Sequence, residues 1–406
     1  MVKLSEQEMI SKTTKPVSLY FHIPFCRKRC NYCDFNTFAN METFVPDYVR
    51  VLREEIRRAG SIVMEGEYVH TIYFGGGTPS VLSGKDYDRI ITEIRKNFHL
   101  TPRPEISMEV NPGAIAPEFL KEIFQLGVNR LSIGMQSSNP EELRTLGRIH
   151  NPIDVINTVK WARKAGFENF SLDLMFGLPE QSLKTWQDTI EFALRLKPTH
   201  ISLYSLTVEE KTPFAKWLLK GLLPITEEDL TADMYEYAMT FLPKRDFVQY
   251  EISNWAKKGS DKTSYLCQHN LQYWLNQPYI GIGAGAHSYY NHERWENIST
   301  IPGYIQAKKK FGNQKIIFAQ INPHELDKKT EMQETMFMGL RLVQQGVSNR
   351  EFQERFGKSI LDIFSKEVDE LLRIGLMEWT GENNGYLRLT QRGILMGNQV
   401  FMRFVD

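Results

Sequence analysis

The sequence predicts an α/β fold with a parallel sheet, followed by a smaller helical domain that ends in a β-hairpin. Two patterns indicate this fold. Six short β-rich runs alternate with amphipathic stretches, and a helical periodicity takes over from Glu325. The length of 406 residues allows two or three domains. Repeated strand–helix–strand units form right-handed parallel crossovers, so we expect either a partial (β/α)6 barrel or an open doubly wound sheet.

The strands of the predicted sheet are runs rich in β-branched and aromatic residues. They are Val17–His22, Thr71–Phe74, Glu105–Val110, Arg130–Gly134, Asn169–Leu174 and His200–Leu206. Between most of them, apolar residues recur at helical spacing. These residues are Tyr48, Val51, Leu52 and Ile56, then Leu120, Ile123 and Phe124, then Ile156, Val159 and Ala162. In both candidate architectures, the functional site lies at the carboxyl ends of the strands.

The C-terminal part of the chain has a different pattern of apolar residues, which is mainly helical. Met332, Met336, Leu340 and Val343 would share one helix face, as would Ile360, Phe364, Val368 and Leu371. Residues 376–390 are typical of a hairpin around Asn383-Asn384-Gly385, and a last helix starts near Thr390. This order resembles a winged-helix domain. The segment has 11 Lys and Arg against 13 Asp and Glu, a net charge of −2, which disfavours nucleic acid as a partner.

These patterns predict four segments. Residues 1–15 would be an N-terminal tail, and residues 16–290 would hold the α/β domain with an associated segment. Residues 291–324 would be an irregular linker, and residues 325–406 the C-terminal helical, winged-helix-like domain.

Composition restricts the class of protein. Lys and Arg number 49 and Asp and Glu number 49, so the formal net charge is zero and gives no global attraction to nucleic acid. The sequence has no run of 18 apolar residues, and its polar start lacks the apolar core of a signal peptide. Four cysteines are too few for a disulfide framework, which favours a reducing, cytoplasmic location.

Three of the cysteines form the most informative motif. Cys26, Cys30 and Cys33 stand at C-x3-C-x2-C spacing just after the first predicted strand, separated by polar and charged residues. Three buried thiols fit this setting poorly. Zinc would want a fourth ligand, such as His22 or Cys267. A [4Fe–4S] cluster would leave one iron open, and the cations of residues 27–29 would offset its negative charge.

Distinctive residues also follow the later strands. Gly75–Pro79 follows the second strand, Glu109 and then Asn111–Gly113 end the third, and Gln136 and Gly177–Pro179 follow the fourth and fifth. A glycine-rich turn lets a ligand approach the backbone closely, although a purely structural turn needs glycine as well. Because parallel strands end at one edge of a sheet, we expect a single site there.

The cysteine spacing and the strand ends together resemble the radical S-adenosylmethionine (SAM) superfamily. The resemblance implies a partial (β/α)6 radical SAM barrel, with a [4Fe–4S] cluster on the three cysteines and SAM chelating the fourth iron. It implies SAM-binding roles for a set of matching positions. These positions are Tyr20, Tyr32, Gly76, Gly77, Thr78, Glu109, Gln136, Arg148 and Asp173. The alternative for Glu109 is a solvated strand end, and the alternative for Arg148 and Asp173 is a structural ion pair.

The order of motifs along the chain narrows the resemblance further. Five motifs resemble those of the oxygen-independent coproporphyrinogen III oxidase group. They are YFHIPFC, GGGTP, EVNPG, LGRIH and DLMFGLP. That oxidase has a fourth cysteine where this chain has Phe35, and a longer arm than the 25 residues before Cys26. Both departures match the HemW haem chaperone family, which also has an HNxxYW motif, here at residues 269–274.

The HemW resemblance implies haem as a third ligand, with His269 as its iron ligand and a hydrogen-bonded structural histidine as the alternative. A neutral imidazole ligates haem iron well, and Tyr273 and Trp274 could stack on a porphyrin. His287 is a second candidate, and Cys267 is either a ligand or, more simply, a buried thiol. We expect transfer of haem to an acceptor protein, with membrane attachment of that acceptor and oligomerisation of this chain left open. Oxidative decarboxylation of coproporphyrinogen III and a partner-binding scaffold are the competing functions.

Overall fold

A computed structural model describes residues 16–64, 66–224, 226–259, 264–311 and 317–405. The predicted tail at residues 1–15 lies outside the described residues. The chain divides into two compact units. The first unit runs to Phe170 and includes Thr207–Leu223 and Pro278–His324, whereas the second contains Ser171–Leu206, Pro224–Gln277 and Glu325–Asp406. None of the described helices is long and apolar enough to cross a membrane.

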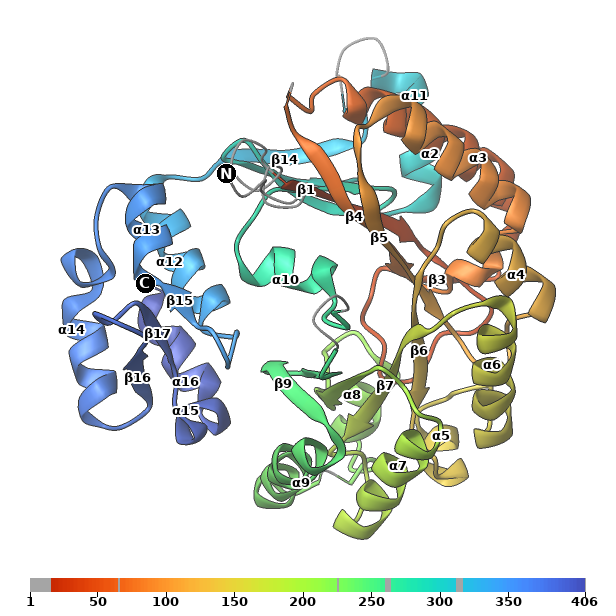
Figure 1. Cartoon of the computed structure of the whole chain (residues 1–406). Coiled ribbons are helices and arrows are strands. Elements are labelled where there is room, and N and C mark those ends of the chain that lie inside the picture. The colour runs from red at the N-terminus through yellow and green to blue at the C-terminus, as the bar shows by residue number, and fades with distance from the viewer. Residues whose placement is uncertain (1–15, 65, 225, 260–263, 312–316, 406) are drawn as a thin grey trace, which may run out of the picture. The chain divides into compact units, whose positions relative to one another are not determined.

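The first unit is built on a sheet with strand order β14-β13-β12-β11-β1-β4-β5-β6 (Figure 1). Strands β11, β1, β4, β5 and β6 are parallel, whereas β12 and β13 are antiparallel additions beside β11. The strands are β1 (Pro16–Ile23), β4 (Tyr68–Gly76), β5 (Leu100–Val110), β6 (Arg130–Gln136), β11 (Tyr279–Ile282), β12 (His287–Tyr290), β13 (Glu293–Asn297) and β14 (Gln320–Glu325). A short parallel pair, β2 (Phe25–Cys26) and β3 (Phe38–Ala39), carries the first cysteine.

The three predicted helices of this unit, α2, α4 and α6, form as expected with most of their apolar residues on the buried face, and further helices accompany them. The helices of the unit are α2 (Val45–Gly60), α3 (Gly84–Asn97), α4 (Pro117–Gln125), α5 (Pro140–Thr145), α6 (Pro152–Ala165), α8 (Pro213–Leu219) and α11 (Ile301–Phe311), with 3-10 turns η1 (Glu42–Phe44) and η2 (Pro79–Val81). Helix α3 begins at a capping box in which Ser83 and Asp86 exchange side-chain and backbone bonds. Phe124 and Ile156, assigned to apolar faces, are instead partly exposed at 38% and 41%.

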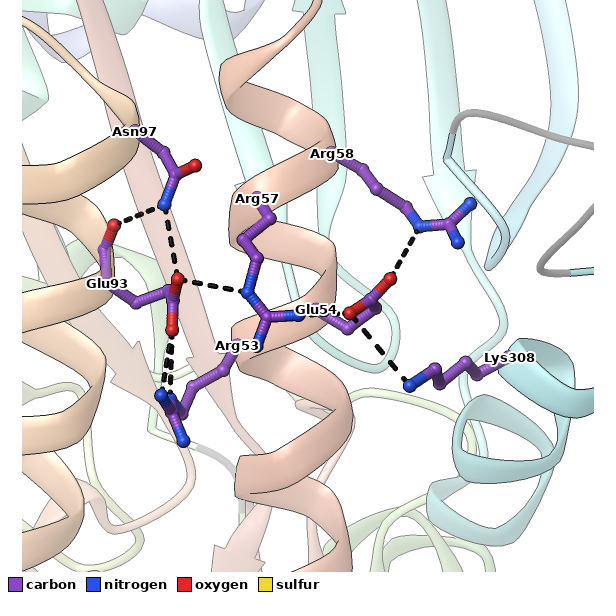
Figure 2. Close-up of polar contacts among 7 residues, drawn as sticks. All are labelled: Arg53, Glu54, Arg57, Arg58, Glu93, Asn97 and Lys308. Atoms are coloured by element: carbon purple, nitrogen blue, oxygen red, sulfur yellow. Dashed lines mark hydrogen bonds and ion pairs between the residues drawn. The ribbon is translucent and has the colours of Figure 1, made fainter.

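A network of ion pairs connects α2 with its neighbours α3 and α11 (Figure 2). Glu93 on α3 accepts hydrogen bonds from Arg53 at 2.9 Å and from Arg57 at 3.0 Å. Burial alone would raise the pKa of Glu93, but these two guanidinium groups hold it below its usual value. Glu54 on α2 also lies 3.9 Å from the Lys308 ammonium on α11. The network fixes α2 against helices that are distant in sequence.

The second unit contains four hydrogen-bonded strands, in the order β7-β8-β10-β9, and a C-terminal helical part. Strands β7 (Asn169–Phe176) and β8 (His200–Ser205) are parallel, and β10 (Asn254–Lys257) and β9 (Phe247–Glu251) continue the sheet antiparallel. Helices α7 (Leu183–Arg195), α9 (Glu228–Phe241) and α10 (Gln268–Trp274) and the 3-10 turn η3 (Leu242–Arg245) accompany it. The two units together supply the six βα strands that the sequence predicts, and the β9–β10 pair was not predicted.

The C-terminal part of the second unit confirms the predicted helices and hairpin. It contains β15 (Val347–Ser348), β16 (Met377–Thr380), β17 (Tyr386–Leu389), α12 (Lys328–Gly339), α13 (Asn349–Phe356), α14 (Ile360–Arg373), α15 (Gln391–Leu395), α16 (Gly397–Phe401) and η4 (Met402–Phe404). The predicted faces of α12 and α14 meet in one apolar core. Asn383 and Asn384 both adopt a φ of 54° in the hairpin turn, a conformation that asparagine tolerates. Thr390 caps the last predicted helix.

The expectation of irregular structure at residues 291–324 is wrong. This segment contains β13, α11 and β14 and belongs to the first unit. Ile301, Tyr304 and Ala307 are buried at helical spacing, and Trp295 is buried on β13. The sequence signal is weak because α11 buries only three apolar residues, β13 buries only the apolar residue Trp295, and β14 buries none.

Candidate functional site

The cysteine loop lies at the carboxyl ends of the parallel strands of the first unit. The parallel register pairs Ile23 with Gly76, and Val110 with Ile133, so β1, β4, β5 and β6 end together. Cys26 ends β2, and Cys30 and Cys33 follow on the loop. Asn31 anchors the loop backbone, because its N–H donates to Leu146 at 3.0 Å and its carbonyl accepts from Phe214 at 3.1 Å. Because these backbone bonds hold Asn31 in place, the side chains that define the site come from the residues on either side of it.

All three loop thiols are reduced, and each has a polar neighbour. Thr78 Oγ1 donates to Cys26 Sγ at 3.6 Å, and Arg148 Nη1 donates to Cys30 Sγ at 3.5 Å. Burial raises the pKa of the Cys26 and Cys33 thiols, so any metal bound there would have to supply the free energy for their ionisation. In the described part of the chain, no three His, Cys, Asp or Glu side chains converge as around a single ion. A cluster does not require such convergence, since its thiolates bind different irons.

A chain of hydrogen bonds connects the cysteines to the strand ends. Asn111 after β5 donates to Thr78 Oγ1 at 2.9 Å, and its side-chain oxygen accepts from Arg148. Arg148 also donates to the Gly134 carbonyl of β6 at 2.9 Å. Cys26, Thr78, Asn111, Arg148 and Cys30 therefore form one continuous arc. A small pocket opens within it, lined also by Arg27, Lys28 and Ile149.

The glycine-rich end of β4 is packed without room for side chains. Gly76 has a φ of 107°, and a Cβ there would lie 2.5 Å from the His22 ring. A Cβ on Gly77 would lie 2.6 Å from the Phe25 carbonyl oxygen. The Gly76 N–H donates to the Glu109 carboxylate at 3.1 Å. Glycine is therefore required here by the fold itself, in addition to any ligand.

Gln136 occupies an unusual backbone position at the end of β6. Its φ is 65°, a left-handed conformation that is uncommon for a residue with a long side chain. Residues in such conformations gather at functional sites, where the surrounding structure maintains the strain. The side chain of Gln136 therefore leaves the backbone in a different direction from the side chain of a regular strand residue.

The two aromatic candidates, Tyr20 and Tyr32, are both close to the cysteine loop. The Tyr20 hydroxyl bonds to His22 Nδ1 at 3.0 Å, and its ring stacks on Tyr73 at 6.3 Å between centroids. Burial raises the pKa of Tyr32, a shift that the Arg148 charge opposes and the Cys30 thiol increases. Both tyrosines are therefore neutral hydroxyl groups at physiological pH.

Most of the predicted SAM-binding positions belong to the first unit, but Asp173 does not. It lies on β7 of the second unit, where its carboxylate accepts a hydrogen bond from Ser171 at 2.9 Å. The first unit therefore contains the cysteines and the other candidates, and of these Thr78 and Arg148 are hydrogen-bonded to cysteine sulfurs; the others are Tyr20, Tyr32, Gly76, Gly77, Glu109 and Gln136. The SAM-binding role of each residue stays a prediction.

The HNxxYW motif forms helix α10 of the second unit, and its side chains are packed. His269 is 1% exposed, and its Nε2 is hydrogen-bonded to the Tyr273 hydroxyl at 3.1 Å. The Arg341 guanidinium lies 4.5 Å from the centroid of the Trp274 ring, so one indole face is covered. Cys267, just before the helix, is fully buried. The role of His269 as an iron ligand stays a prediction, and in this packing its ring is not presented to a ligand.

Sequence reasoning placed Asn111 at a strand end of the site without assigning it a contact, and it missed Asn36 and Glu55. Asn111 completes the hydrogen-bonded arc, and Asn36 donates to the carbonyls of Ala284 at 3.0 Å and Ser299 at 2.9 Å. Glu55 is fully buried on α2 and binds the Gly283 N–H at 3.0 Å. Of the two missed residues, only Glu55 has a sequence signal, because it falls on the apolar face of its helix.

The comparisons with known proteins agree with this geometry. Residues 20–193 match the family model of the radical SAM superfamily, and residues 326–396 match that of the HemN C-terminal domain. The structure of coproporphyrinogen III oxidase (HemN) from Escherichia coli superposes with a TM-score of 0.81 at 23% identity, covering 99% of this chain and 93% of that one. This likeness confirms the fold, a partial (β/α)6 radical SAM barrel with a C-terminal helical, winged-helix-like domain.

Curated relatives define the family more narrowly. "Heme chaperone HemW" of Bacillus subtilis (strain 168) is 38% identical over 96% of this chain and 99% of its own length. The protein of the same name from Lactococcus lactis is 37% identical over 96% and 98%, and that from Escherichia coli (strain K12) is 42% identical over 67% and 70%. The arrangement of the cysteine loop and the two matches that span 96% of this chain lead to one conclusion: the chain belongs to the HemW family of the radical SAM superfamily.

Proposed function

We propose that Cys26, Cys30 and Cys33 hold a [4Fe–4S] cluster and that SAM binds beside it at the strand ends. The fit of the donor set supports this proposal, since three thiols stand on one anchored loop among hydrogen-bond donors. Thr78 and Arg148 would donate to the cluster's thiolates and so stabilise their negative charge. When bound, the reduced cluster and SAM supply the electron transfer chemistry of the superfamily.

Different residues around the loop would contact different parts of SAM. The Gly76–Gly77 backbone and the Glu109 carboxylate would meet its amino group, and Tyr20 or Tyr32 its adenine. Gln136 and Arg148 would contact its other polar groups, and Asp173 stays a candidate from the sequence alone. A buried hydrogen bond lost from such a contact costs about 1–3 kcal/mol.

Calorimetry of the cluster-loaded protein tests this pocket. We expect Gln136→Ala and Asp173→Ala each to weaken SAM binding by about 1–3 kcal/mol. Asp188→Ala is a matched control, because Asp188 forms an exposed ion pair with Lys184 on α7. Wild-type affinity in both test variants would show that the pocket is assigned to the wrong residues.

We further propose that the chain binds haem and passes it to an acceptor protein. The observation that carries this proposal is full-length similarity to relatives whose names describe heme chaperones. Phe35 supports it, since the residue that replaces the oxidase's fourth cysteine is 66% exposed directly beside the cysteine loop. An exposed apolar side chain in a polar loop suits a transient, planar ligand.

A titration with ferric haem tests the chaperone function. We expect about one haem per chain and a shift of the Soret band at micromolar concentrations. The competing function is oxidative decarboxylation of coproporphyrinogen III. It is considered because this chain shares the fold of the solved coproporphyrinogen III oxidase. We expect no vinyl product by chromatography from the cluster-loaded protein with SAM under reducing, anaerobic conditions. Product above the level without enzyme would restore the oxidase function, and an unchanged Soret band would remove the chaperone function.

A further inference from the structure

A chain of buried polar side chains runs through the second unit. Ser171 on β7 donates to the Asp173 carboxylate at 2.9 Å, and its oxygen lies 2.9 Å from His200 Nδ1 on β8. His200 Nε2 lies 2.9 Å from the Tyr250 hydroxyl on β9, and that hydroxyl accepts the Cys267 N–H at 3.3 Å. We call these five residues the relay. The relay begins at a candidate SAM contact and ends at the residue before α10, the helix of the HNxxYW motif.

The strand register places much of the relay on one face of the sheet. Ser171 is paired with His200, and Asp173 with Ser202, across the parallel strands β7 and β8. Side chains two residues apart on a strand point to the same face. The Ser202 hydroxyl adds a contact of 3.0 Å to that of Ser171. Ser171 and His200 are fully buried and Tyr250 is 5% exposed, so water has little access to these bonds.

The groups at the two ends fix the direction of the bonds between them. An ionised carboxylate only accepts, so Ser171 donates its single proton to Asp173 and has to accept from His200 Nδ1–H. A backbone N–H only donates, so the Tyr250 oxygen accepts from Cys267 and its own proton goes to His200 Nε2. A neutral imidazole with its proton on Nδ1 satisfies both ends at once. Every hydrogen bond along the relay therefore points toward Asp173.

The haem motif at the far end of the relay has to open before it can bind iron. His269 is 1% exposed, and its Nε2 is hydrogen-bonded to the Tyr273 hydroxyl. If His269 ligates haem iron, as the sequence predicts, the ring becomes available only by local opening of α10. A helix of seven residues is unstable by itself, so contacts at its ends help to hold it. The bond from the Cys267 N–H to Tyr250 is one such contact.

We propose that the relay, with His200 as its central positioning residue, couples SAM binding at Asp173 to the opening of α10 and so sets how fast haem is loaded and released. The inference rests on the proposed function, with Asp173 as a SAM contact and His269 as the haem ligand. Hydrogen bonds in a buried chain strengthen one another. A SAM group that donates to Asp173 would reduce its charge and weaken the bond from Ser171. The relay would then hold the Cys267 N–H less firmly, and α10 would open more often.

Opening of this kind changes rates and leaves affinity unchanged. Haem enters and leaves by the same opened helix, so both rates rise together and the equilibrium constant keeps its value. Haem would stay stably bound until an acceptor takes it, and SAM would shorten the time of transfer. The relay would thereby separate the storage of haem from its delivery.

Hydrogen–deuterium exchange of the full, cluster-loaded chain tests the relay. We expect Tyr250→Phe to speed amide exchange at residues 267–274 by about 5–30-fold, as for one lost buried hydrogen bond. Tyr235→Phe is the matched control, because it removes a hydroxyl of the same unit that donates to the Ile252 carbonyl at 2.6 Å, outside the relay. Equal exchange at α10 in the two variants would overturn the proposal, since loss of any tyrosine hydroxyl would then loosen the helix.

Addition of SAM tests the coupling itself, which a merely structural role would not produce. SAM should speed exchange in α10 of the unaltered chain by about fivefold or more, a typical coupling between two sites. His200→Phe keeps a ring without either nitrogen and should abolish this response. Ser171→Ala is a smaller change to the same relay and should abolish it too, while calorimetry still detects SAM binding. A response that persists in both variants would contradict the proposal.

Haem release to apomyoglobin gives an independent readout. SAM should shorten the half-time of release from the unaltered chain by a similar factor, whereas the haem affinity from a Soret titration keeps its value. In Ser171→Ala the half-time should be equal with and without SAM. A half-time that does not respond to bound SAM in the unaltered chain would overturn the proposal. Failure of the unaltered chain to bind SAM or haem would instead remove the proposed function, which is a distinguishable result.

Discussion

The cysteine loop and the HNxxYW helix hold the two most distinctive motifs of this sequence, but their side chains are in opposite situations. Cys30 and Cys33 are partly exposed on a loop that a few backbone bonds hold in place. His269 is buried against Tyr273, and Trp274 is covered by Arg341. These two loop cysteines are partly accessible to a ligand, whereas the His269 and Trp274 side chains of the helix form contacts within the second unit.

This difference shows that a motif identifies residues but not their exposure. Cysteines among charged residues at a strand end indicate an open loop. A histidine followed by a tyrosine four residues later forms an edge-on pair on one helix face, with centroids 5.2 Å apart. The same spacing that suggests a ligand site therefore also builds local packing.

The largest expected effect separates the loop cysteines from the buried one. Replacement of Cys26, Cys30 and Cys33 by Ala should abolish the cluster's visible absorbance and its electron paramagnetic resonance signal after anaerobic reconstitution. Cys267→Ala is the control, because Cys267 is a fully buried thiol in the other unit. A triple variant that still holds about four irons per chain would contradict the assignment.

The second prediction compares two aromatic residues in these regions. Trp274→Ala should lower the free energy of unfolding by about 3 kcal/mol, since it removes a large packed ring and its contact with Arg341. Phe35→Ala should change it by only about 0.5 kcal/mol, because that ring is 66% exposed. Urea denaturation measures both. Equal effects would show that the two motifs are packed alike.

The third prediction concerns the carboxyl group behind the cysteine loop. Burial raises the pKa of Glu55 to about 7, although Tyr304, Gly283 and Asn297 donate hydrogen bonds to it. The folded state therefore binds this proton more tightly than the unfolded state, whose pKa is near 4.5. The stability that the protonated group contributes is complete below that value and falls as pH rises through 7, by up to about 3 kcal/mol.

Glu55→Gln tests this linkage directly. The variant should lose the decline in unfolding free energy between pH 5 and 7.5, measured by denaturation at a series of pH values. Glu93→Gln is a control of the opposite kind, because arginines lower the pKa of Glu93. A wild-type pH profile in Glu55→Gln would show that another group titrates.

The smallest expected effect concerns the glycine-rich end of β4. Gly76→Ala should cost about 1–3 kcal/mol, because the residue has a φ of 107° and a Cβ would clash with the His22 ring. Gly221→Ala is matched in backbone conformation, with a φ of 67°, but a Cβ there meets open space. Thermal unfolding should show the smaller shift for Gly221→Ala. Equal shifts would mean that backbone strain alone, without crowding, explains the requirement.

Much of the fold could be predicted because its signals are local. Short β-rich runs identify the six βα strands, and apolar residues at helical spacing identify helices between them. Asn383-Asn384-Gly385 marks the hairpin. The grouping of residues from separate strand ends follows from parallel topology. The bonds of Asn36 to residues 284 and 299 could not be predicted, since they depend on which distant turn meets the loop. The burial of His269 is likewise a property of tertiary packing.

The path of the chain has a consequence for synthesis on the ribosome. The chain passes from one unit to the other five times, and Ser18 of β1 pairs with Tyr279 of β11, 261 residues later. At about 5–20 residues per second, about 13–50 s separate the emergence of these two strands. During that interval one edge of β1 lacks its neighbour, and the cysteine loop lacks the turn that Asn36 binds. Metal loading in the cell should therefore follow translation of β11, when about two-thirds of the chain already exists.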